Sequence, residues 1–182
     1  MENIVGSLGE RHEAHATKSK YLNDDPHYPC TIVGDRYKWT CYFFQTSRMM
    51  QLFSGDFAKI SVSCAQAPTP YQRVCFESMG RDVSGRYRGD PAGAIQACSF
   101  ATPSAFRTAC LSGAVQDTFW EPAGKNNAIN FCKHLEDSIE KDACYSTIFA
   151  RALEIFSSNE DVKFFCLTAE AEYQLACLDL VR

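Results

Sequence analysis

Cysteine is the residue type with the clearest chemistry in this sequence. The 182 residues include ten cysteines, and these fall into five pairs whose members are 11 or 12 residues apart. The pairs are Cys30 and Cys41, Cys64 and Cys75, Cys98 and Cys110, Cys132 and Cys144, and Cys166 and Cys177. Cysteine pairs either form disulfides or ligate metal ions, and the spacing of the cysteines helps to separate the two cases.

Metal ligation is the less favoured chemistry for these cysteines. Zinc, iron–sulfur and haem sites use cysteines only a few residues apart, as in C-x2-C, often together with histidine. The sequence contains no C-x2-C motif. We therefore predict five structural disulfides and no cofactor. Because disulfides persist in oxidising compartments, we expect the protein to be extracellular, at the cell surface or in the periplasm.

The cysteines recur at a fixed period, which indicates the elements that position them. The first members of the pairs follow one another every 34 residues, at positions 30, 64, 98, 132 and 166. A period of this length is typical of tandem helical hairpins. We therefore expect an all-α, right-handed solenoid of five hairpins over residues 30–182, each with one internal disulfide. Residues 1–29 are expected to form a partial, degenerate repeat.

Within each hairpin, a short helix carries the first cysteine and a longer helix carries the second. The first cysteine lies near the end of its helix, and the second lies one to two turns into the antiparallel partner. Both cysteines are then at a similar height, within the Cα separation of about 4.4–6.8 Å that a disulfide requires.

The long helices share an apolar pattern around their cysteines. An aromatic residue lies four positions before the second cysteine in four repeats, and an apolar residue directly follows that cysteine in all five. This spacing gives one apolar face on each helix. The fourth repeat has Glu140 at the aromatic position, and we expect the neighbouring Ile139 to take the place of the aromatic side chain.

The 34-residue helical hairpins resemble the tetratricopeptide repeat class, and one disulfide per hairpin is similar to secreted bacterial helical-repeat proteins. The tetratricopeptide signature is not matched, because Trp39 and Trp120 do not occupy equivalent positions in their repeats. The resemblance implies a binding or scaffolding surface, with one helix of each hairpin lining a concave face, and no catalytic activity.

Charge and motifs argue against several classes of protein. The net charge of −4 gives no positive surface for nucleic acid. The longest apolar runs span only a few residues, so we expect no membrane span. The sequence lacks the G-x-S-x-G, P-loop and G-x-G-x-x-G motifs, and paired cysteines leave no thiol nucleophile. We therefore do not expect an enzyme.

Two histidines near the start of the sequence are the candidate metal ligands. The segment ERHEAHA places His12 and His15 three residues apart, on one face if the segment is helical, with Glu10 and Glu13 nearby. Such a group can chelate zinc, copper or nickel. A solvated polar segment is the alternative that we favour.

Three arginines form the first candidate ligand-binding group. Arg81, Arg86 and Arg88 alternate with glycines in the segment SMGRDVSGRYRGD, and arginine binds anionic groups through paired donors. The alternative that we favour is that the two glycines inside the helix, Gly80 and Gly85, let the helix of a neighbouring repeat approach closely. Gly113 occurs near the position of Gly80 in the next repeat, which supports this packing role.

Residues 88–90 also spell R-G-D, a tripeptide that some adhesion receptors bind. Its last two letters recur one repeat earlier as Gly55 and Asp56. We therefore interpret Gly89 and Asp90 as a repeat loop followed by a helix cap.

Two aromatic residues end the third long helix and form the second candidate group. Phe119 and Trp120 are adjacent there. Aromatic side chains at such positions are usually core, which we favour, but an exposed pair can anchor a partner protein or a sugar.

Three functions follow from these patterns. We expect first an extracellular, non-enzymatic scaffold that binds a protein, peptide or glycan. The second possibility is a self-assembling subunit of a surface filament, because residues 177–182 and 1–10 read as two halves of one helix. The third is a metal-binding protein that uses His12 and His15.

Overall fold

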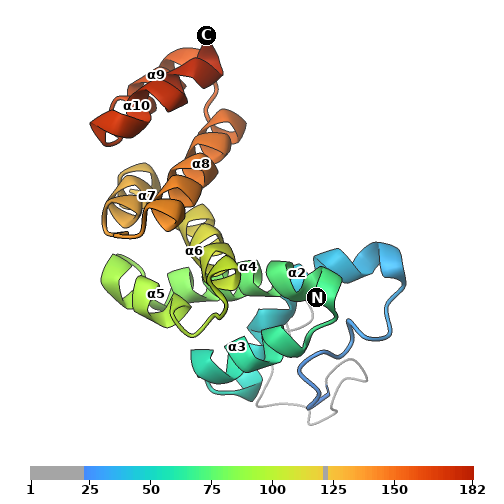
Figure 1. Cartoon of the computed structure of the whole chain (residues 1–182). Coiled ribbons are helices and arrows are strands. Elements are labelled where there is room, and N and C mark those ends of the chain that lie inside the picture. The colour runs from blue at the N-terminus through green and yellow to red at the C-terminus, as the bar shows by residue number, and fades with distance from the viewer. Residues whose placement is uncertain (1–22, 121–122) are drawn as a thin grey trace, which may run out of the picture.

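The computed structural model describes residues 23–120 and 123–182, and these residues form nine α-helices, one short 3-10 helix and no strand (Figure 1). The long helices are α2 (Asp35–Leu52), α4 (Thr69–Arg86), α6 (Ser104–Thr118) and α8 (Ser138–Ile155). The short helices are α3 (Phe57–Gln66), α5 (Pro91–Cys98), α7 (Gly124–Lys133), α9 (Asn159–Cys166) and α10 (Ala171–Leu178), followed by η1 (Asp179–Val181). The expected all-α class is confirmed.

The helices are arranged in the order of the chain. Helices α3 and α4, α5 and α6, α7 and α8, and α9 and α10 pack as pairs. The long helices α2, α4, α6 and α8 also pack against one another in sequence. In Figure 1 the path runs from α2–α5 in the lower half, through α6, to α9 and α10 at the top. None of the helices in the described ranges is long and apolar enough to cross a membrane.

Short polar side chains begin several of these helices. Asp56, Asp90, Asp137 and Ser158 precede α3, α5, α8 and α9, and each side chain accepts a hydrogen bond from a backbone N–H of the first turn. These N–H groups have no partner within the helix, so the caps satisfy them. The interpretation of Asp90 as a helix cap is therefore confirmed.

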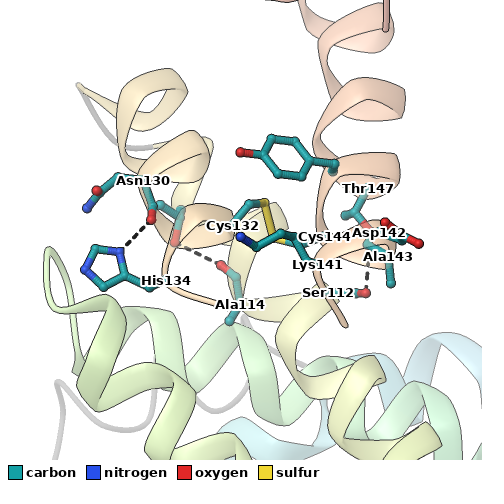
Figure 2. The surroundings of a disulfide bond; sticks show 12 residues. Ser112, Ala114, Asn130, Cys132, His134, Lys141, Asp142, Ala143, Cys144 and Thr147 are labelled. Carbon is teal, nitrogen blue, oxygen red and sulfur yellow. Dashed lines mark hydrogen bonds between the residues drawn. A yellow bond between two sulfur atoms is a disulfide. The ribbon is translucent and has the colours of Figure 1, made fainter. Parts of the chain in front are cut away.

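The five disulfides join the cysteines that the spacing pairs. Their Cα–Cα distances are 5.4–5.6 Å, and all ten cysteines are buried. Figure 2 shows one of them, Cys132–Cys144, between α7 and α8. Beside it, the Thr147 hydroxyl of α8 donates a hydrogen bond to Ser112 Oγ of α6 at 3.4 Å.

The first disulfide differs from the expected helical hairpin. Cys30 lies in a segment of turns and bends at residues 24–33, and only Cys41 lies in a helix, α2. Pro26 and Pro29 explain the difference. Proline lacks the N–H that a helix needs and disfavours helical geometry in the residue before it.

A repeated side-chain contact connects consecutive long helices and α10. The residue directly after the second cysteine of one hairpin stacks on the residue four before the second cysteine of the next, and we call these two residues a junction pair. The aromatic junction pairs are Tyr42–Tyr71, Phe76–Phe106 and Tyr145–Tyr173, with ring centroids 5.2, 4.5 and 4.0 Å apart. Offset stacking of this kind stabilises a packed contact beyond the area it buries.

The junction between α6 and α8 lacks this stacking. Its two positions hold Leu111 and Glu140, and both side chains are buried. Glu140 forms an ion pair with Arg107 of α6, with Nε and Oε1 2.9 Å apart. Ile139 is 72% exposed, so the expectation that it replaces the aromatic side chain is wrong. Glu140 keeps the inward position because it is in register with the aromatic residues of the other helices.

Glycines set the closest approach of two long helices, α4 and α6. A Cβ added at Gly80 would collide with the backbone carbonyl of Cys110, and one added at Gly113 would collide with the carbonyl of Glu77. The same addition at Gly85 would meet no atom within 4 Å. The packing interpretation of Gly80 and Gly113 is therefore confirmed, and it does not extend to Gly85.

Candidate functional site

A surface pocket of about 180 Å³ lies where the four long helices come together. We call it the long-helix pocket. Its lining consists of Phe43, Phe44, Glu77, Arg81, Gly113, Gln116, Asp117, Trp120 and Arg151. Apolar surface with a few convergent polar groups is the usual composition of a binding site. The lining of this pocket combines three aromatic rings with two arginines, two carboxylates and an amide.

Arg81 enters the pocket from α4 and is held by α2. Its Nη2 atom donates a hydrogen bond to Ser47 Oγ at 2.8 Å. Its guanidinium carbon lies 5.0 Å from the ring centroid of Phe44 and 5.9 Å from that of Phe43. A guanidinium at these distances is attracted to the ring faces. Contacts to α2 therefore hold the cation in place above two aromatic rings.

A buried polar contact behind Arg81 fixes α4 against α2. The Thr46 hydroxyl donates a hydrogen bond to Asp82 Oδ2 at 2.6 Å and also contacts the Ser78 hydroxyl. Thr46 and Ser78 are fully buried. Asp82 Oδ1 lies 3.6 Å from Arg81 Nη2. Because buried polar groups need partners, this cluster favours one register of the two helices and so positions Arg81.

Trp120 forms the opposite side of the pocket together with Arg151 of α8. The guanidinium of Arg151 lies 4.8 Å from the Trp120 ring, and Trp120 is 64% exposed. Phe119, its neighbour, is buried and packs edge-on against Phe165 with centroids 5.5 Å apart. The core interpretation is therefore right for Phe119 and wrong for Trp120, which presents its ring to solvent beside a cation.

The two carboxylates of the pocket balance its two cations. Burial raises the pKa of Glu77, and the Arg73 guanidinium, 3.2 Å away, opposes that shift. Asp117 and Gln116 both line the pocket from α6. The pocket therefore offers donors and acceptors together, as a partner with groups of both charges requires.

Only some of the predicted binding residues come together. Arg81 and Trp120, which are far apart in the sequence, line the same pocket. Arg86 lies in the last turn of α4 and Arg88 in the loop that follows, and both are exposed outside this pocket. Sequence reasoning missed Arg151, which no local motif distinguishes from other surface arginines.

The R-G-D tripeptide is explained by the loop that contains it. Gly89 has a φ of 75°, a left-handed conformation that favours glycine. The Asp90 side chain accepts a hydrogen bond from Gly93 N at 3.0 Å at the start of α5. Gly55 and Asp56 repeat this arrangement before α3, with a φ of 77° at the glycine.

The predicted metal ligands His12 and His15 lie outside the described residues. Within residues 23–120 and 123–182, no group of three or more histidine, cysteine or acidic side chains is placed to hold a metal ion. Metal binding by His12 and His15 stays a prediction.

Comparison with known proteins adds no functional assignment. No protein-family model, no curated protein and no solved structure matches the chain. The chemistry of the long-helix pocket is therefore the basis for a functional proposal. Guanidinium, carboxylate, amide and aromatic groups are all suited to reversible binding.

Proposed function

We propose that the protein is a non-enzymatic scaffold that binds a protein or peptide through the long-helix pocket, outside the cytoplasm. The main support for the proposal is that Trp120, Arg81 and Arg151, which belong to three different hairpins, line one pocket. Tryptophan and arginine are the residues most enriched at binding hot spots. A peptide segment supplies the apolar, anionic and cationic groups that this mixed lining can accept.

The proposed architecture is a right-handed solenoid of five hairpin repeats, in which the long helices form the binding face. The stacking of α2, α4, α6 and α8 in chain order supports it. Stacked repeats present such extended surfaces, and one residue from each repeat can contribute to a shared site. Five buried disulfides keep the face in place in an extracellular, surface or periplasmic environment.

Display of a random peptide library against the full chain tests the proposal. We expect enriched peptides whose dissociation constants rise about tenfold or more in Trp120→Ala and Arg151→Ala variants, which is the usual loss at a hot spot. Isothermal titration calorimetry measures the constants. Circular dichroism checks that the variants remain folded, as expected for an exposed tryptophan.

Phe164→Ala is the matched control, because Phe164 is an exposed aromatic residue on α9 outside the pocket. We expect this variant to bind the enriched peptides as the unmodified chain does. Peptides whose affinity is equally sensitive to Phe164→Ala and Trp120→Ala, or a library that yields no binder, would contradict the proposal.

A further inference from the structure

One residue of each junction pair, the one directly after the second cysteine, is fully buried only where the next helix packs against it. Tyr42, Phe76, Leu111 and Tyr145, which directly follow the second cysteine of their hairpins, are at most 1% exposed. Tyr42, Phe76 and Tyr145 each stack on the aromatic residue four before the second cysteine of the next hairpin, and Leu111 lies between α6 and α8, which pack together. Full burial at this position therefore marks a completed junction between neighbouring helices.

Helix α10 carries this first half in an open form. Leu178 directly follows Cys177, and it is only partly buried. Leu175, one turn earlier on the same helix, is 60% exposed. No further helix follows η1 among the described residues to cover Leu178. Leu175 lies at a position that is exposed in other hairpins too, as Arg73 and Asp142 are. Two leucines at this spacing form an apolar surface on one side of α10.

Helix α2 carries the second half, also in an open form. Tyr37 lies four residues before Cys41, which is the position of Tyr71, Phe106 and Tyr173 in the later hairpins. It is 53% exposed, and its ring contacts the guanidinium of Arg36 at 4.5 Å. Among the described helices, none precedes α2 to supply the partner that the other aromatic residues have.

The junction between α8 and α10 gives the geometry that the two open halves would adopt. There the ring of Tyr173 stacks on Tyr145, and its hydroxyl donates a hydrogen bond at 2.6 Å to Asp142, two residues before Cys144. On α10 the corresponding positions hold Leu178 and Leu175. A tyrosine placed there would stack its ring on Leu178 and bring its hydroxyl to the edge of the contact beside Leu175, a position that is exposed as Asp142 is.

We propose that α10 of one molecule packs against α2 of a second copy of this chain, with Tyr37 seated on Leu175 and Leu178. The contact continues the stacking already present between hairpins within the molecule. It is heterologous, because the two surfaces differ, and repetition of such a contact extends an open head-to-tail assembly unless a ring closes. It uses none of the residues that line the long-helix pocket, so it is independent of the proposed binding function.

Sedimentation velocity of the full chain between 1 µM and 1 mM tests the assembly. We expect species larger than a monomer that increase with concentration. Leu178→Asp and Tyr37→Asp should each weaken the association constant at least tenfold, because Leu178 corresponds to the buried Tyr145 and each substitution introduces a charge into an apolar contact. Phe164→Asp and Val62→Asp are matched controls, since both replace exposed apolar residues on other faces, and they should associate as the unmodified chain does.

Mixing the two interface variants separates a head-to-tail contact from other modes of association. A Tyr37→Asp chain keeps its α10 surface, and a Leu178→Asp chain keeps its α2 surface. At a concentration at which the unmodified chain associates, each variant alone should stay mostly monomeric, and the mixture should form a one-to-one dimer with no larger species. The dimer has one intact junction, and both of its outer ends are blocked.

Three results would overturn the proposal. The first is a chain that stays monomeric up to 1 mM. The second is association that the Phe164→Asp and Val62→Asp controls weaken as much as the interface variants do. The third is a mixture of the two interface variants that remains monomeric.

Discussion

Glu140 is the residue at which the long helices depart from their shared pattern. It occupies a position that holds tyrosine or phenylalanine in the other hairpins, and it is buried, whereas Tyr71, Phe106 and Tyr173 are partly buried. Burial raises the pKa of its carboxyl group; the Arg107 charge opposes the shift and the Asp137 charge adds to it. The folded protein therefore favours the protonated form of Glu140 more than the unfolded chain does.

This shift predicts a pH dependence of stability that Glu140→Gln removes. Because the pKa is raised on folding, the contribution of Glu140 is largest at low pH. It falls as the pH rises through the unfolded value, about 4.3, towards the higher folded value. Urea denaturation between pH 3.5 and 7 should show the variant gaining stability relative to the unmodified chain as the pH rises. A difference that is constant with pH, or as large for Glu172→Gln on exposed α10 surface, would contradict this assignment.

At the scale of elements, helix contacts depend on residues that have no side chain. Gly80 and Gly113 allow α4 and α6 to approach until the backbone of each helix meets the other. These are the most closely packed of the long helices. The sequence predicted this role because both glycines lie inside expected helices, where glycine is unfavourable. It could not distinguish Gly80 from Gly85, because the difference lies in what each faces.

We therefore expect opposite effects from two similar substitutions on α4. Gly80→Ala should lower the free energy of unfolding by about 1–3 kcal/mol, since the added methyl group overpacks a contact made of backbone. Gly85→Ala should raise it by up to about 1 kcal/mol, since alanine favours the helix and the added group meets open space. Urea denaturation with the disulfides intact measures both. Equal effects of the two substitutions would contradict the assigned contact.

At the scale of the whole molecule, the helices follow one another in chain order, so each hairpin depends mainly on its neighbours. Helix α9 packs on α8 and α10, and α10 packs on α9 and η1. Helices α4 and α6 contact hairpins on both sides. In stacked architectures of this kind, the loss of an end unit is local, whereas the loss of an inner unit spreads.

Removal of single disulfides should reveal this arrangement. In a Cys166→Ala, Cys177→Ala variant, we expect amide hydrogen exchange to accelerate in residues 159–181 and to stay unchanged in residues 69–118. In a Cys98→Ala, Cys110→Ala variant, faster exchange should extend into both α4 and α8. Hydrogen exchange with mass spectrometry measures the two patterns. Equal, molecule-wide acceleration in both variants would indicate a single cooperative unit instead.

The sequence alone determined the features that are local within a hairpin. In four of the pairs, cysteines 11 or 12 residues apart lie at one height on two adjacent helices, so their spacing was sufficient to predict the pairing. The cap formed by Asp90 and the all-α class follow in the same way, because a helix start depends on the few residues around it. The turn at Cys30 departs from the expected hairpin because two prolines override the repeat period.

Only the tertiary structure decided which residues from different hairpins meet. The long-helix pocket combines Phe44, Arg81, Trp120 and Arg151, and the inward position of Glu140 depends on Arg107 in the preceding hairpin. These contacts depend on the angle and register between helices, which are set by the packing of whole helix faces. Part of that packing is the close approach of α4 and α6, which Gly80 and Gly113 allow because they have no side chain. A period read from one chain specifies that neighbouring helices pack, but not which side chains their packing brings together.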